Sequence, residues 1–143
     1  MTTATDNNPF RAARMAGLLY VLIAMIGPFA IMYMPTTVFT LGDAAANAAS
    51  MAEHSGLLRL GILADMGIIV LEVFVTAIFY ALFKNVSGSW AAAAAYARLG
   101  MIVVMVMNLL NYLMPLFILE GGEMLAAFTL EQQQALALMF VEM

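Results

Sequence analysis

The sequence lacks cysteine and carries little charge of either sign. Without cysteine the chain can form no disulfide, iron–sulfur cluster or thiolate metal site. Charged residues make up 10% of its 143 residues, whereas soluble domains average about 25%. Five lysines and arginines stand against nine acids, for a net charge of −4, and they form no basic patch that could hold phosphates. We therefore predict no nucleic-acid partner.

The sequence also lacks the motifs of common catalytic and cofactor sites. It contains no glycine-rich phosphate loop, no histidine-rich zinc motif and no nucleophile elbow. The only histidine, His54, follows Glu53 and fits a solvated surface residue better than a metal or haem ligand. The 14 methionines could suit copper(I), but they are scattered through all the apolar stretches, as core-filling residues are. We predict no catalytic residue, no cofactor and no bound metal.

Long apolar runs dominate what is present. Hydrophobic residues make up 65% of the chain and the mean hydropathy is +0.98, which indicates an integral membrane protein. The run from Gly56 to Phe83 alone is long enough to cross a hydrocarbon core of about 30 Å. We predict an all-α, polytopic transmembrane helix bundle, one domain over residues 10–143. Its three full spans are expected at about residues 15–34, 57–83 and 91–119.

The first of these runs follows a polar tail, residues 1–9, which we expect to be disordered. Two arginines before an apolar run also fit a cleaved signal peptide. The run exceeds the usual apolar core of about 7–15 residues, however, so a retained span is favoured. Pro28 predicts a bend inside this span, because proline cannot donate a backbone hydrogen bond, and Pro35 predicts its end.

Two shorter helices are predicted outside these spans. Asp43 is a plausible N-cap for an alanine-rich helix over residues 43–54, which is too polar to cross a membrane and is expected on the external surface. Thr129-Leu-Glu-Gln132 has the form of a capping box and predicts a helix over residues 130–143. At roughly 21 Å that helix is too short to span. It is either interfacial or the start of a fourth, incomplete membrane helix in a longer chain, and we favour the second.

The basic residues predict an orientation. Arg11, Arg14 and Lys84 flank one side of the predicted bundle, whereas Arg59 is the only basic residue near the other side. Because cytoplasmic loops carry the excess of lysine and arginine, the N-terminus is expected in the cytoplasm and the helix over 43–54 outside.

Five polar side chains interrupt the second and third spans: Asp65, Glu72, Arg98, Asn108 and Asn111. A short loop makes these spans antiparallel neighbours, so depths can be compared from the turn between them. Glu72 lies about 17 Å deep and Arg98 about 12 Å, an offset that an arginine stem bridges. Asp65 and Asn108 both lie about 27 Å deep, with Asn111 one turn further. We predict a polar seam with Glu72 facing Arg98 and Asp65 facing Asn108.

The seam has two interpretations. It can hold the helices in register, with hydrogen bonds and an ion pair worth about 0.6–2 kcal/mol each. It can also form a proton or ion path or a polar ligand site, because ionisable groups inside membranes are usually functional. The structural interpretation is favoured, although two acids with one matched cation leave an excess acid.

Several stretches resemble a bacterial multi-pass membrane family, the domain of unknown function 4386. In chain order they are RMAGLLYVLI, LGDAAANAA, GLLRLGILADM, YARLG, NLLNYL and TLEQQQALALMF, and they cover most of residues 11–140. The resemblance implies a polytopic protein of the bacterial inner membrane with six or seven spans. Family members continue past the matching region, which fits the expectation of a longer chain. The family has no established activity, so the resemblance implies no mechanism.

We therefore predict a non-catalytic membrane protein that binds membrane lipids or a larger membrane protein complex through its apolar faces. The alternative is a transporter-like or proton-conducting protein that uses Glu72, Asp65 and Arg98. A membrane-embedded enzyme is a third possibility.

Overall fold

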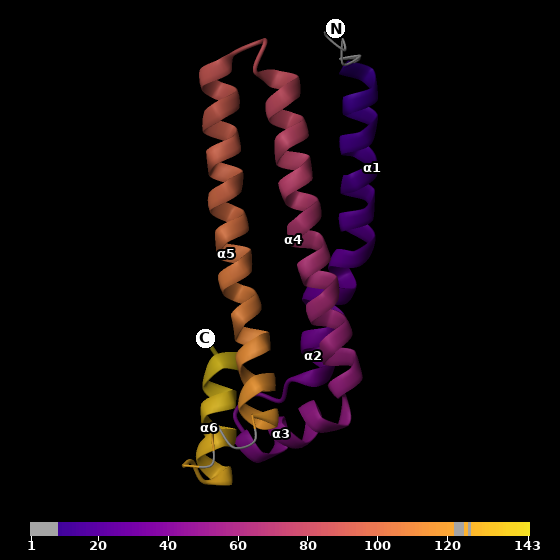
Figure 1. Cartoon of the computed structure of the whole chain (residues 1–143). Helices are drawn as coiled ribbons and strands as arrows, with labels where there is room; N and C mark the ends of the chain where they lie inside the picture. The colour runs from indigo at the N-terminus through magenta and orange to yellow at the C-terminus, as the bar shows by residue number, and fades with distance from the viewer. Residues whose placement is uncertain (1–8, 122–124, 126) are drawn as a thin grey trace, which may run out of the picture.

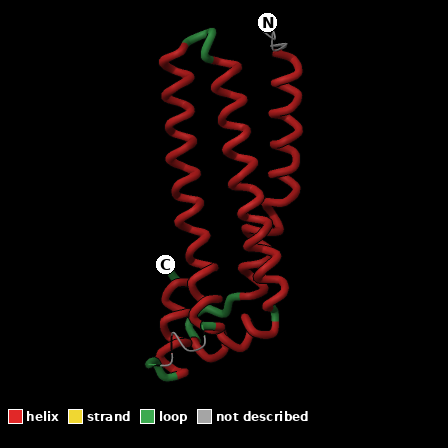
Figure 2. The backbone as a smooth tube through the Cα atoms, in the orientation of Figure 1, coloured by secondary structure: helices red, strands yellow, loops and turns green. Residues whose placement is uncertain are grey.

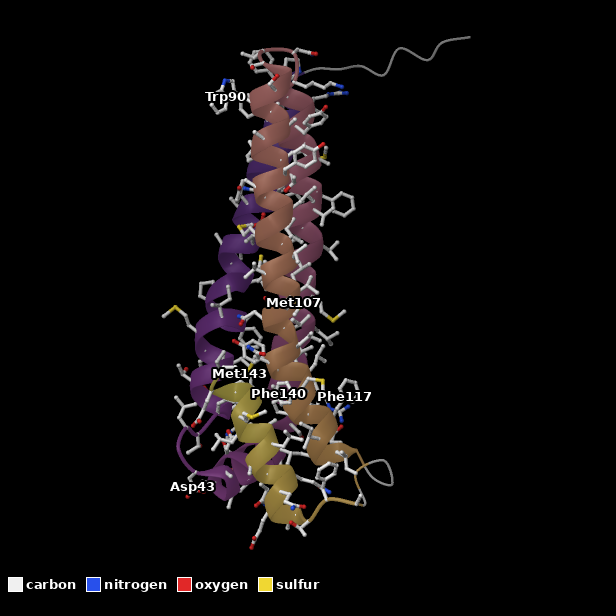
Figure 3. The ribbon with its side chains drawn as sticks, turned by 90° about the vertical axis from the view of Figure 1, so that its left-hand side faces the viewer. Asp43, Trp90, Met107, Phe117, Phe140 and Met143 are labelled. Carbon is white, nitrogen blue, oxygen red and sulfur yellow. The ribbon has the colours of Figure 1, made fainter. Side chains whose placement is uncertain are left out.

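The computed structural model describes residues 9–121, 125 and 127–143, so the predicted tail lies, apart from Pro9, outside the described residues. The described part of the chain contains helices and no strand, which confirms the predicted all-α class. Long helices stand side by side, and the shorter ones gather at one end of them (Figures 1 and 2). Figure 3 shows Asp43 near that end and Trp90 near the opposite end.

Three helical stretches of the described chain are long and apolar enough to cross a membrane, as predicted. The first runs from Pro9 to Val38, and the other two are α4, Ser55–Phe83, and α5, Gly88–Glu120. The first consists of three consecutive pieces: α1 over Pro9–Gly27, the π-helix η1 over Pro28–Tyr33, and α2 over Met34–Val38.

The first stretch does not end at Pro35, as its sequence predicted, but continues to Val38. Pro35 stands in the first turn of α2, directly after η1, and the helical stretch continues through it. The Pro35 carbonyl then accepts from the Phe39 N–H at 3.0 Å and closes the last turn. The irregularity expected at Pro28 takes the form of the wider π-helical turn that begins there.

Both short helices begin at the side chains that predicted them. The Oδ1 of Asp43 accepts from the Ala46 N–H at 3.0 Å and caps α3, Ala44–Glu53. Thr129 and Gln132 form both halves of a capping box at the start of α6, Leu130–Val141. α6 lies beside α3 and the end of α5 (Figure 1).

The apolar core lies in the half of the bundle near α2 and α3. Its buried members come from α2, α3, α4 and α5: Met34, Val38, Met51, Leu58, Ile62 and Leu109. Gly61 on α4 lets α2 approach closely, because a Cβ at this position would lie 2.7 Å from the Cε of Met34. The opposite half has buried apolar side chains of its own, among them Ala16, Val75 and Ala91, outside this cluster.

Candidate functional site

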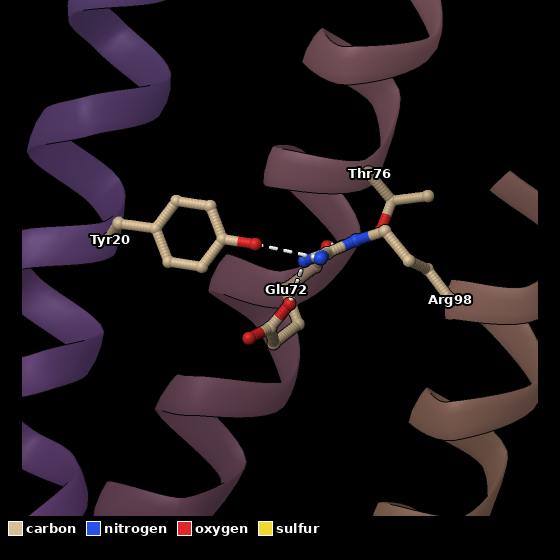
Figure 4. Close-up of polar contacts among 4 residues, drawn as sticks. All are labelled: Tyr20, Glu72, Thr76 and Arg98. Atoms are coloured by element: carbon tan, nitrogen blue, oxygen red, sulfur yellow. Dashed lines mark hydrogen bonds and ion pairs between the residues drawn. The ribbon is translucent and has the colours of Figure 1, made fainter. Parts of the chain in front are cut away.

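An ion pair joins α4 to α5 in the half of the bundle away from the apolar core. The Nη2 of Arg98 on α5 donates to the Oε2 of Glu72 on α4 (Figure 4). The Arg98 Nε donates to the Thr76 hydroxyl at 3.1 Å, and that hydroxyl donates to the Glu72 carbonyl oxygen at 2.7 Å. The Glu72 side chain is 10% exposed and that of Arg98 is 23% exposed. The structure thus brings together the first pair that depth matching predicted.

Arg98 also reaches α1. Its Nη1 donates to the Tyr20 hydroxyl at 2.7 Å, and its guanidinium carbon lies 5.6 Å from the centre of the Tyr20 ring (Figure 4). The Phe79 ring of α4 lies at the same 5.6 Å, within the range of a cation–π contact. One side chain therefore connects α1, α4 and α5. We call Tyr20, Glu72, Thr76, Phe79 and Arg98 the arginine cluster.

Sequence reasoning missed three members of this cluster. Thr76 and Phe79 follow Glu72 by one and two helical turns, so they share its face of α4, and this spacing could have revealed them. Tyr20 lies about 9 Å beyond Arg14 along its helix, close to the depth of about 12 Å estimated for Arg98. The same depth comparison, extended to the first span, could have found it.

The second predicted pair does not form. Asp65 is 7% exposed, and no hydrogen bond to it occurs among the described residues. Asn108 lies exposed on α5 and accepts a long hydrogen bond, 3.4 Å, from the Nδ2 of Asn111. Matched depth did not place Asn108 opposite Asp65, and the rotation of the helix explains why.

Each residue turns an α-helix by about 100°, so the position of Asn108 is rotated by about 80° from that of Arg98, which faces α4. Tyr112 is rotated by only about 40° from Arg98 and faces the same way. Depth alone therefore selected the wrong residue on α5. At the far end of α4, Arg59 pairs with Glu120 at 2.9 Å, so this cation serves α5 and not Asp65.

The family model described as "Domain of unknown function (DUF4386)" matches residues 15–143. The chain belongs to this family. No curated protein and no solved structure matches it. This is the family that the sequence resembles. Its description assigns no reaction to its members.

In this DUF4386 member the charges of the arginine cluster balance within the chain. Arg98 has one ionic partner, two hydroxyl oxygens that accept from it and two aromatic rings. A cation with this many partners is suited to holding helices together. The described residues contain no group of three or more His, Asp or Glu side chains that could hold a metal ion. Asp65 is the one residue of the predicted seam that is buried without a hydrogen bond in this part of the chain.

Proposed function

We propose that this chain is a non-catalytic integral membrane protein that binds partner helices of a larger membrane complex through α5. The observation that carries the proposal is the exposed carboxamide of Asn108, within a helix apolar enough to cross a membrane. A carboxamide in hydrocarbon without partners costs several kcal/mol, and its one bond to Asn111 is long. A partner helix would satisfy it, since asparagine side chains hydrogen-bond across helices in membranes.

The surroundings of Asn108 support this reading. Val104 lies one turn from Asn108 on the same face of α5 and is 67% exposed, and Met107, the residue before Asn108, is 60% exposed. Figure 3 shows Met107 on the outside of the helix. A polar centre between exposed apolar side chains is the pattern of a face that packs against another helix.

The arginine cluster supports a structural role for the other half of the bundle. Its ion pair is closed within the chain, so it fixes α1, α4 and α5 relative to one another and offers no unbalanced charge to a ligand. A register-setting function is the best-attested use of such a buried pair.

A second candidate is a proton-conducting or transporter-like protein that uses Asp65, Glu72 and Arg98. The position of Asp65, a residue only 7% exposed within an apolar helix, favours it, because ionisable groups inside membranes commonly relay protons. Its weakness is that Glu72 is already paired with Arg98.

Purification in mild detergent, with mass spectrometry of the companion proteins, separates the two candidates. A binding subunit co-purifies with a partner at fixed stoichiometry, retains it after Glu72→Gln, and holds it about 3- to 30-fold more weakly after Asn108→Leu. Val103→Leu, on another exposed face of α5, is the matched control and leaves binding unchanged. A conductor purifies alone and loses proton flux in vesicles after Glu72→Gln or Asp65→Asn. The absence of any companion protein would contradict the binding role.

We further infer that the protein resides in the bacterial inner membrane with its N-terminus in the cytoplasm. The start of α1 and the turn between α4 and α5 lie at the same end of the bundle (Figure 1). Arg11, Arg14 and Lys84 belong to that end, which supports the orientation through the positive-inside rule.

A further inference from the structure

A groove of about 280 Å³ runs between α4 and α5 next to the turn that joins them. Phe79 and Phe83 of α4 line one wall, and Ala91 and Ala95 of α5 line the other. The alanines leave open the space that larger side chains would fill against these rings. Trp90 also lines the groove; it is 80% exposed and lies near the end of the bundle in Figure 3. This volume lies just below the range of small-molecule pockets, about 300–1,000 Å³, so it suits one narrow acyl chain better than a bulky ligand.

The inner end of the groove is formed by Thr76 and Arg98. Glu72 balances the charge of Arg98, so this end presents no net charge to a ligand. An anionic group would also have to lose its hydration to reach this depth, which is costly in hydrocarbon. The part of a ligand that lies deepest is therefore hydrocarbon, and any headgroup stays at the end near the turn.

The end of the bundle near the turn is positively charged. Lys84 lies in the turn, and α1, which carries Arg14 in its first half, begins at the same end (Figure 1). No Asp or Glu occurs in α1 or in residues 84–90, among the described residues. A lysine or arginine near the membrane surface contributes about 1 kcal/mol to the binding of anionic lipids. Trp90 is of the type that prefers the level of lipid headgroups.

We propose that this groove binds one acyl chain of an anionic phospholipid, whose phosphate lies at Lys84 and whose first methylene groups contact Trp90. The acyl chain of the lipid then runs along Phe83 and Phe79 toward Thr76. This proposal rests on the membrane insertion proposed above. It adds the class of lipid that is bound and the position of its binding site.

Trp90 is the only tryptophan in the protein and reports directly on the groove. The full chain is reconstituted in vesicles that contain either an anionic phosphatidylglycerol or a zwitterionic phosphatidylcholine with brominated acyl chains, and bromine quenching of Trp90 fluorescence is titrated. The anionic lipid is expected to quench at a several-fold lower mole fraction. Equal quenching by both lipids would overturn the site while leaving membrane insertion intact. Quenching by neither lipid would mean that the protein is not inserted in the bilayer or that another protein covers the groove. Either result would overturn the lipid site.

Two variants test the two ends of the site. Lys84→Gln is expected to lower the preference for the anionic lipid about fivefold, which corresponds to about 1 kcal/mol, and Lys84→Arg to retain it. Ala95→Leu fills the groove and should remove the preference, whereas Ala97→Leu, exposed on α5 outside the groove, should not. An unchanged preference in Lys84→Gln or in Ala95→Leu would overturn the corresponding half of the proposal.

Discussion

Arg98 contributes three kinds of interaction to one place in the structure. Its guanidinium makes an ion pair with Glu72, donates hydrogen bonds to Tyr20 and Thr76, and lies near two aromatic rings. The loss of each partner has a different effect on the stability of the protein. Loss of a hydroxyl partner removes one hydrogen bond, whereas loss of the arginine leaves a buried carboxylate without its counterion.

This difference yields a prediction for Arg98→Leu. The single variant should lose about 3–5 kcal/mol of stability, because it leaves Glu72 buried and unpaired. The double variant Arg98→Leu with Glu72→Leu should recover much of that loss, since it removes both charges together. Thermal unfolding in detergent measures the difference as a higher Tm for the double variant.

The control for this comparison is Arg59→Leu. Its ion pair with Glu120 is exposed, with side-chain exposures of 60% and 48%, so its loss should cost no more than about 1 kcal/mol. Equal Tm values for the single and double variants would show that Glu72 and Arg98 do not depend on each other.

At this scale the sequence predicted part of the site. Depth counting found Glu72 and Arg98 because both lie on the facing sides of neighbouring helices. Depth counting failed to find a partner for Asp65, because depth does not show which side of a helix a residue occupies. Asn108 lies at a matching depth but on an exposed side of α5. Depth comparison with the first span could have selected Tyr20, but its contact with Arg98 also depends on how α1 packs against α4.

Among the elements, α2 and α4 approach each other closely at one glycine. Met34 is fully buried against Gly61, where the absence of a Cβ lets the two helices approach. Close approach at small residues is a common way for membrane helices to associate, because dispersion contacts replace the hydrophobic effect there.

We expect Gly61→Ala to destabilise the protein by about 1–3 kcal/mol, because the new Cβ would overlap the Met34 side chain near its backbone end. Gly67→Ala in the same helix is the matched control, since a Cβ there meets nothing within 4 Å. It should be neutral or stabilising by up to about 1 kcal/mol, from helix propensity. Tm values in one detergent measure both changes, and equal values would contradict close packing at Gly61.

The long helices were predictable from hydrophobic run length, and α3 and α6 from their capping residues. The end of the first stretch was not. A proline usually ends or kinks a helix, but Pro35 follows a π-helical segment, and the helical stretch continues through it to Val38. A sequence does not reveal a change of helical pitch before the proline.

As a whole, the molecule buries little of its long helices against itself. In the most apolar window of each candidate span, 11%, 22% and 22% of the residues are buried. This large exposed apolar surface fits hydrocarbon as its surrounding. Because the protein has no cysteine, a single cysteine introduced by mutation can be labelled specifically. Labelling of such variants measures the orientation of the protein in the membrane.

Asn85→Cys, in the turn between α4 and α5, is expected to be shielded from a membrane-impermeant maleimide in intact cells and labelled after lysis. Ala45→Cys, exposed on α3, should be labelled in intact cells. These outcomes follow from a cytoplasmic N-terminus. The reverse pattern would place α3 in the cytoplasm.

The length of α4 has a consequence for the bilayer around it. Between Arg59 and Lys84 the helix rises by about 37 Å, which exceeds a typical hydrocarbon thickness of about 30 Å. Such hydrophobic mismatch is relieved when helices tilt or when lipids locally thicken. Because α5 is joined to α4 by a short turn and the arginine cluster ties α1 to both, the helices have to tilt together. A thinner membrane would therefore favour a larger tilt of all three helices together, or a thicker ring of lipid around them.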